Sequence, residues 1–190
     1  TKLFGLSFVP RTDIPIYNDS VKVFQVLDEE KNHLGIFYGD YFPRSSKRSG
    51  AWMTNFVNQL NLGEYNVRPM IVNVCNFTPA SGSTPSLLNI DETLTLFHEF
   101  GHALHGMLTQ THYPSVSGTS VKHDFVELFS QINEKWSIHP EVLPTYAKHY
   151  LTGEAIPDSL IAKMQKSAHF NLGFETTELV AAALLDTKMH

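Results

Sequence analysis

The sequence predicts an α+β fold, in which a small N-terminal antiparallel sheet is followed by a mainly helical body. Residues 1–77 contain short runs rich in Val, Phe, Leu and Tyr, which favour strands. Residues 91–190 instead carry apolar residues at helical spacing. The chain has 190 residues, of which 42% are hydrophobic and 17% charged. That composition is typical of a globular domain with a substantial core.

Four strands are expected in the N-terminal part. The runs LFGLSFV (3–9), VKVFQVLD (21–28) and LGIFYGDYF (34–42) have strand composition, and the polar EEKNH between the last two predicts a hairpin. The run PMIVNVCNF (69–77) is almost continuously apolar, which is typical of a strand buried on both faces. Residues 78–90 are rich in turn formers and form the expected connection to the first helix.

Helices are expected over most of the remaining chain. Asp91 is the predicted N-cap of the first helix, and Glu92 suits its first turn. Proline and asparagine residues mark the starts of several later helices. The predicted helices cover residues 91–108, 122–138, 140–151, 157–169 and 171–188. No internal repeat interrupts them, and a length of 190 residues predicts that 1–190 belongs to a single domain.

Charge and composition exclude several classes of partner. The chain has 14 basic and 19 acidic residues, a net charge of −5, which gives no support to nucleic-acid binding. No run of 18 apolar residues predicts a membrane span. The single cysteine, Cys75, excludes an internal disulfide and fits a reducing, cytoplasmic compartment. A periplasmic location stays open, because the chain looks like a piece excised from a longer parent, with its N- and C-terminal portions missing.

The run TLFHEFGHALHGML (95–108) carries the strongest chemical signal. His98 and His102 are four residues apart, so on a helix they share one face and their rings can reach one cation. Glu99 lies beside them, where it can accept a proton from an attacking water. H-E-x-x-H on a helix is the pattern of zinc metalloproteases. The alternative is a histidine-rich structural helix without a metal.

A hydrolytic zinc site needs a third protein ligand. The extended H-E-x-x-H-x-x-G-x-x-H form would place a glycine at position 105 and a histidine at position 108, where this chain has His105 and Leu108. His105 lies about 10 Å along the helix from His98 and cannot join it on one ion. We interpret it as a hydrogen-bond donor to the ligands, as a group on the substrate side near His102, or as a buried structural histidine.

A carboxylate from the segment HDFVELFSQINEKW (123–136) is the remaining source of a third ligand. Its apolar residues define one helical face, which consists of Phe125, Leu128, Phe129, Ile132 and Trp136. Glu127, Gln131 and Glu134 form a polar stripe beside it, and Asp124 lies one turn before Glu127. Spacing alone leaves both glutamates as candidates.

These motifs together resemble the thimet oligopeptidase-type family of zinc metallopeptidases. The resemblance rests on LFHEFGHALH followed by SGTSVKHDFVELFSQINEKW, and it extends to residues 34–52, 72–78 and 139–190. It is greatest to the bacterial peptidyl-dipeptidases, which remove dipeptides from peptide C-termini. Carried over residue by residue, it implies His98, His102 and Glu127 as the ligands of one Zn²⁺. It also implies Glu99 as the general base.

The resemblance implies a zincin-like fold and zinc-dependent hydrolysis of short peptides. Asp124 or Glu134 is then expected to accept a hydrogen bond from the free N–H of a ligand imidazole, and the alternative is that both are surface carboxylates. Family members are several times longer than this chain, and their tyrosine- and histidine-bearing catalytic loop would fall beyond residue 190. We therefore expect little or no turnover from the 190 residues alone. The alternative is a non-catalytic zinc-binding fragment, inactive without the missing parts.

Two further segments and one glycine also receive an interpretation from the sequence. The basic cluster Arg44, Lys47 and Arg48 is interpreted as a solvated loop, with binding of a peptide carboxylate as its alternative. Residues 113–120 have the composition of an edge segment that pairs with an extended substrate, or of a plain loop. Gly101, between the two histidines, is expected to allow close helix packing.

Overall fold

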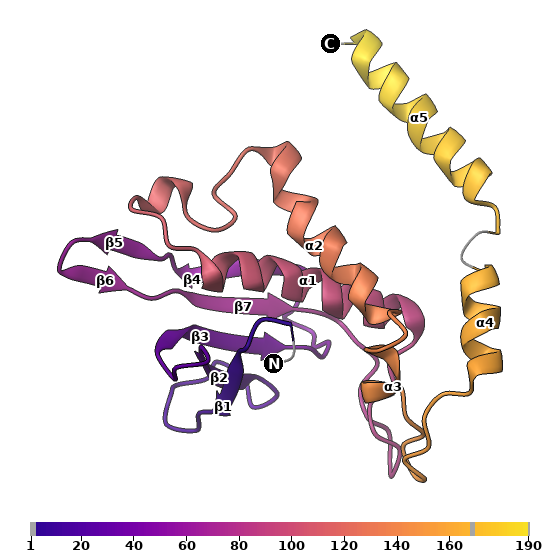
Figure 1. Cartoon of the computed structure of the whole chain (residues 1–190), viewed down its shortest axis with the longest axis horizontal. Coiled ribbons are helices and arrows are strands. Elements are labelled where there is room, and N and C mark those ends of the chain that lie inside the picture. Colours follow the sequence, from indigo (N-terminus) through magenta and orange to yellow (C-terminus); the bar gives the residue numbers. More distant parts are fainter. Residues whose placement is uncertain (1–2, 168–169, 190) are drawn as a thin grey trace. The chain divides into compact units, whose positions relative to one another are not determined.

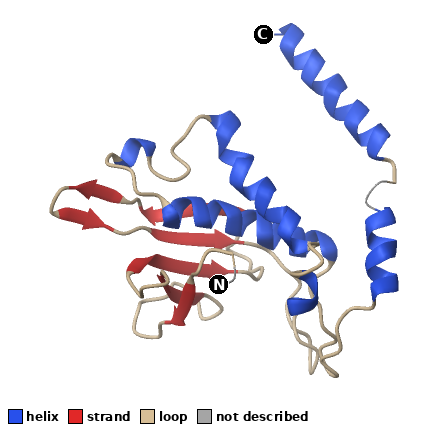
Figure 2. Ribbon diagram, viewed as in Figure 1, coloured by secondary structure: helices blue, strands red, loops and turns tan. Residues whose placement is uncertain are grey.

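The computed structural model describes residues 3–167 and 170–189. The chain divides into two units, residues 1–142 and residues 143–190, and each is described by itself. Strands fill the first part of the chain and helices the second, so the α+β class is confirmed (Figure 2). None of the helices in these described ranges is long and apolar enough to cross a membrane.

Unit 1 is built on a five-stranded sheet whose strand order is β1-β2-β3-β7-β4. A separate hairpin of two short strands, β5 and β6, connects β4 to β7 (Figure 1). The strands span Ser7–Pro10 (β1), Lys22–Leu27 (β2), His33–Asp40 (β3), Trp52–Val57 (β4), Leu60–Leu62 (β5), Tyr65–Val67 (β6) and Met70–Val74 (β7).

The sheet is mixed, which corrects the expected purely antiparallel arrangement. β3 and β7 are parallel, with Phe37 opposite Ile71, whereas the other pairs are antiparallel. β7 inserts between β3 and β4 and is buried on both faces, as its continuous apolar run predicts. Strand β4 was not among the predicted strands, because Thr54 and Asn55 interrupt its apolar character at the sheet edge.

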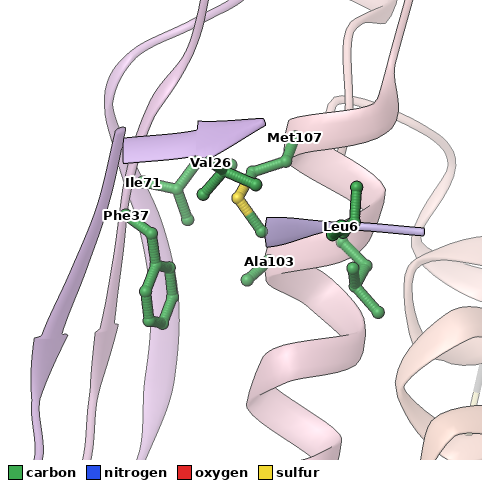
Figure 3. Close-up of a cluster of buried hydrophobic side chains, with 7 residues drawn as sticks. Leu6, Val26, Phe37, Ile71, Ala103 and Met107 are labelled. Atoms are coloured by element: carbon green, nitrogen blue, oxygen red, sulfur yellow. The ribbon is translucent and has the colours of Figure 1, made fainter. Parts of the chain in front are cut away.

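Helix α1 (Ile90–Leu108) packs along one face of this sheet and forms the main core with it. The close-up in Figure 3 shows side chains of the sheet meeting those of the helix. Seven buried residues form the cluster, namely Leu6, Val26, Phe37, Ile71, Ala103, Leu104 and Met107. A second cluster covers the opposite face of the sheet and centres on Tyr38, Val72 and Val74. Ala103, Leu104 and Met107 fix the C-terminal half of α1 to this core, so the motif residues next to them have a rigid support.

Helix α2 (His123–Ser137) packs on α1 rather than on the sheet (Figure 1). It turns a face of small and polar residues toward α1, with Ser130, Asn133 and Ser137 buried. Its predicted apolar face points outward, and Phe125 and Ile132 are 42% and 51% exposed. The face formed by Ser130, Asn133 and Ser137 therefore meets the histidine helix, with Glu127 and Glu134 beside it. Of the apolar face, Phe125 and Phe129 contact His105.

The described residues of unit 2 form three helices, α3 (Leu143–Tyr146), α4 (Asp158–Ser167) and α5 (Leu172–Met189). The helix predicted over 140–151 is wrong in extent, because the chain turns after Tyr146 and Lys148 forms an isolated bridge with Ala155. The last two residues of the helix predicted for 157–169 lie outside the described residues. Every described residue of α5 is exposed, so its apolar side chains have no core within this unit.

Candidate metal centre

The start of α1 is fixed by a capping box. The Asn89 side chain accepts a hydrogen bond from the Glu92 backbone N–H at 2.8 Å, and the Glu92 carboxylate accepts one from Asn89 N–H at 3.0 Å. Asn89, and not the predicted Asp91, is therefore the N-cap. Glu92 also accepts two hydrogen bonds from Thr78, which anchors the preceding loop to the helix.

Three of the predicted site residues come together where α2 crosses α1. The Glu127 Oε2 atom lies 3.1 Å from His98 Nε2 and 3.2 Å from His102 Nε2. One ligand atom from each of the three residues lies within 4.8 Å of the others. Each histidine presents Nε2 to the same carboxylate oxygen, so the two turns of α1 and one turn of α2 enclose a common point.

A second glutamate of α2, Glu134, forms a hydrogen bond with the other ring nitrogen of His98. Glu134 Oε1 lies 2.6 Å from His98 Nδ1. A carboxylate can only accept this hydrogen bond, so Nδ1 carries a proton, and Nε2 is the ring nitrogen of His98 that would bind a metal. Of the two glutamates that spacing left open, Glu127 lies between the imidazoles and Glu134 lies behind one of them.

The buried groups of the site have pKa values that burial has shifted. His102 is 7% exposed, and burial is the main cause that lowers its pKa, so its ring is neutral near pH 7. Burial also raises the pKa of Glu99, because it outweighs the opposing electrostatic effect of His98, and the nearby Glu127 carboxylate adds a smaller rise. One Glu99 oxygen, Oε2, is buried without a hydrogen bond among the described residues.

The Glu127 carboxyl is more exposed, with 48% of its side chain accessible. Partial burial would raise its pKa, but the hydrogen bond from Ser130 and the favourable electrostatic interactions with His102 and His98 lower it below the ordinary value. Glu127 is therefore an anion at neutral pH. Two neutral imidazoles and one carboxylate are the donor set that zinc takes in hydrolytic sites.

The distances also fit zinc. Bonds of about 2.0–2.2 Å to nitrogen and oxygen at tetrahedral angles place neighbouring ligand atoms about 3.3 Å apart. The observed separations of 3.1 and 3.2 Å from Glu127 to the two imidazoles are close to this value. The residues present therefore fit a single Zn²⁺ without rearrangement of the backbone.

An open pocket lies over the three residues. Its other wall is the start of β4, an edge strand that pairs only with β7 in the five-stranded sheet. The 113–120 segment contributes Thr119 to the lining, while its first part forms a short 3₁₀ helix (Pro114–Val116) instead of a strand. The lining residues are Ala51, Trp52, Met53, His98, Glu99, His102, Thr119, Val126 and Glu127.

Two of the predicted supporting residues lie apart from the three-residue cluster. Asp124 is exposed in the first turn of α2, and no hydrogen bond or ion pair joins it to an imidazole among the described residues. His105 packs its ring against Phe129, with ring centroids 4.5 Å apart, and burial lowers its pKa. The structure thus places His105 in the α1–α2 interface. Of the three predicted supporting residues, Glu134 is the one that contacts a histidine of the motif.

Sequence reasoning missed the residues that join the two helices. Asn133 donates a hydrogen bond of 2.6 Å to the Phe97 carbonyl oxygen of α1, beside His98, whereas Ser130 packs closely against Gly101 of α1 and donates to Glu127 within α2. The available signal was the spacing of small or amide residues at 130, 133 and 137, which places them on one helical face. Neither their composition nor the apolar stripe beside them indicated that this face is the buried one.

The helices cross at Gly101 so closely that a side chain has no room. A Cβ atom at this position would lie 2.6 Å from Ser130 Cα and 2.7 Å from the Phe129 carbonyl oxygen. Both are backbone atoms, so only a separation of the helices would relieve the overlap. We expect Gly101→Ala to destabilise the protein by about 1–3 kcal/mol and to weaken zinc binding, measured by urea unfolding and chelator competition.

Asp91→Ala is the control for this prediction, because Asp91 occupies an exposed position of the same helix. It should change neither quantity appreciably. If Gly101→Ala keeps wild-type stability and zinc affinity, the close crossing is not required.

The chain belongs to peptidase family M3, whose family model matches residues 1–190. It is 49% identical to the dipeptidyl carboxypeptidase of Escherichia coli (strain K12), over the whole of this chain and 28% of that protein. It is 37% identical to oligopeptidase A of Salmonella typhimurium, again over the whole chain and 28% of the relative. A thimet-like oligopeptidase of Dictyostelium discoideum is 35% identical over 94% of the chain.

These comparisons confirm the resemblance to thimet oligopeptidase-type metallopeptidases. The chain spans about 28% of the length of the curated relatives named first. It therefore corresponds to one part of such a protein, the part that contains the histidine motif and the downstream glutamate.

Proposed function

We propose that this chain is the zinc-binding part of a metallopeptidase that cleaves short peptides, releasing dipeptides from their C-termini. The single observation that carries the proposal is the convergence of His98, His102 and Glu127 on one point, beside the buried Glu99. Membership of family M3 and the name of the Escherichia coli relative support the peptidase class and the dipeptide product.

Each residue of the site has a defined task in this proposal. His98, His102 and Glu127 hold one Zn²⁺, which supplies a Lewis acid for the scissile carbonyl and acidifies water. Glu99 accepts the proton of the attacking water and delivers it to the leaving amine. Its raised pKa favours this double role, because a carboxylate that is too weak a base cannot take the proton. Glu134 fixes the tautomer of His98.

The substrate is proposed to lie along β4. Extended peptides bind to unpaired strand edges through backbone hydrogen bonds, and β4 is the edge strand whose first residues line the pocket. This replaces residues 113–120 as the main strand-like binding segment, since these form a short 3₁₀ helix and loop. A peptide on β4 would pass directly over Glu99 and the ligand cluster.

The proposal is tested on the full-length protein with short synthetic peptides and mass spectrometry of the products. We expect free C-terminal dipeptides, loss of hydrolysis after zinc is removed by a chelator, and recovery when Zn²⁺ is added back. Peptides with an amidated C-terminus serve as the matched substrate control for C-terminal release. Internal cleavage products would contradict the dipeptide assignment but not the peptidase.

The alternative is a site whose zinc only joins helices, without catalysis. The open pocket and the unpaired Glu99 oxygen favour the enzyme. A full-length protein that binds one zinc per chain and cleaves no peptide would establish the alternative. The 190 residues alone are expected to turn over substrate weakly or not at all, since they correspond to only about 28% of the relatives' length.

A further inference from the structure

Ser130 is a fully buried residue of α2 at the point where this helix crosses α1. Its exposure is 0%, and its Cα lies where a Cβ on Gly101 would meet it at 2.6 Å. This close approach explains why the residue is small. It does not explain the hydroxyl, because alanine would fill the same space, and a buried hydroxyl is costly unless it forms a hydrogen bond.

The hydroxyl has two acceptors on one residue. Ser130 Oγ lies 2.8 Å from Glu127 Oε2 and 2.9 Å from the Glu127 carbonyl oxygen. The carbonyl already has a helical N–H available to it, whereas the carboxylate is charged and is the stronger acceptor. The hydroxyl therefore donates chiefly to Oε2.

Oε2 is also the oxygen that faces both histidines. It lies 3.1 Å from His98 Nε2 and 3.2 Å from His102 Nε2. The Glu127 side chain is otherwise 48% exposed and has several rotatable bonds, so an unheld carboxylate would sample many orientations. The Ser130 hydrogen bond occupies one side of Oε2 and leaves the other directed at the imidazoles.

We propose that Ser130 is a positioning residue, whose hydroxyl orients the Glu127 carboxylate for metal binding. The inference rests on the proposed function, since it assigns Ser130 a part in the zinc site. It extends that function to a residue outside the H-E-x-x-H and glutamate pattern. Losing a contact of this kind typically costs 10- to 100-fold in metal affinity.

The test measures the zinc dissociation constant of the full-length protein by competition with a chromophoric chelator. We expect Ser130→Ala to bind zinc about 10- to 100-fold more weakly than wild type. Ser137→Ala is the matched control, because Ser137 is equally buried on the same helix. Its hydroxyl donates to a backbone oxygen, the Glu134 carbonyl, at 2.6 Å. It should stay within twofold of wild type.

A double-mutant cycle separates positioning from a general loss of packing. In a Glu127→Ala background, Ser130→Ala should weaken zinc binding no further, because the carboxylate on which it acts is gone. The visible absorption spectrum of the Co²⁺-substituted protein gives a second readout, and Ser130→Ala should shift its bands while Ser137→Ala leaves them in place.

Wild-type zinc affinity in Ser130→Ala would overturn the inference and leave the proposed function standing. An equal loss with and without Glu127 would also overturn it, since the effect would then arise from packing. A wild-type protein that binds no zinc would instead overturn the proposed function. Zinc binding by the wild-type protein is therefore measured before that of any variant.

Discussion

Replacing Glu99 with glutamine is expected to lower peptide hydrolysis by about 10²- to 10⁴-fold while leaving the zinc content unchanged. Glutamine has nearly the same shape but cannot accept the proton of the attacking water. The three proposed ligands, His98, His102 and Glu127, remain in place in the variant. The comparison requires kcat/KM with a short peptide and zinc content by atomic absorption, both on the full-length protein.

Glu64→Gln provides the control for this substitution. Glu64 is exposed in the turn between β5 and β6, so the same chemical change there should leave both measurements at the wild-type level. A Glu99→Gln protein that keeps more than a tenth of wild-type kcat/KM would remove Glu99 from the proton-transfer role. Loss of zinc together with activity would instead make Glu99 a structural part of the site.

The second large effect is expected at Asp40, far from the ligands in sequence. Asp40 is 1% exposed at the end of β3 and accepts hydrogen bonds from Arg44 at 2.8 and 3.0 Å. It also accepts from Lys47 at 3.0 Å and from Tyr17 at 3.0 Å. The Lys47 side chain is only 2% exposed, so it depends on this carboxylate for its charge partner.

Asp40→Ala should destabilise the full-length protein by about 3–5 kcal/mol, because it leaves a buried ammonium without a counter-charge. The segment between β3 and β4 begins at this network, so we expect hydrolysis to fall as well when Ala51 and Trp52 shift. Asp13→Ala is the control, since Asp13 forms a bidentate pair with Arg11 at the surface and its loss should change stability little. Urea unfolding measures the free energy of unfolding of both variants.

The same network predicts a pH dependence. Burial would raise the pKa of Asp40, but the hydrogen bonds from Arg44, Lys47 and Tyr17 outweigh it and lower the pKa below the ordinary value of 3.8. A lowered folded-state pKa means that the stabilisation is complete above the unfolded value and is lost as the pH falls through the folded one. Wild type should therefore lose this part of its stability below about pH 4, and Asp40→Ala should lack that loss.

The fold class was predictable because strand composition and helical periodicity are local properties of the chain. The positions of β2, β3, α1 and α2 follow from such patterns within a few residues. The parallel pairing of β3 with β7 was not predictable, because it depends on β4 leaving the β3 edge free for a later strand. β4 itself has the mixed polarity of an edge strand, which resembles a loop in sequence.

The candidate site was predictable where chemistry fixes the spacing. The four-residue separation of His98 and His102 places both rings on one face of any helix, and the structure has that helix. The choice between Glu127 and Glu134 depends on how α2 crosses α1, and only the family resemblance supplied it. The crossing is set by Gly101, Ser130 and Asn133, whose small or amide side chains carry no metal-site signature.

The surroundings of the basic cluster Arg44, Lys47 and Arg48 were also not predictable from the sequence. Arg44 and Lys47 read as solvated positions from sequence, yet both point at Asp40, and Lys47 is buried. Arg48 alone stays apart from that network and stacks over Trp52, with its guanidinium 4.9 Å from the ring centroid. Charge in a short polar run does not reveal which member has a buried partner.

The edge position of β4 has a consequence for solubility. An unpaired strand edge is a template on which a second molecule can add a strand and begin aggregation. The strand limits this hazard with only six residues and an irregularity between Asn55 and Val57 that breaks its regular pairing. A longer or straighter β4 would be exposed to self-association, so a mutation that regularises this strand should make the protein prone to precipitate.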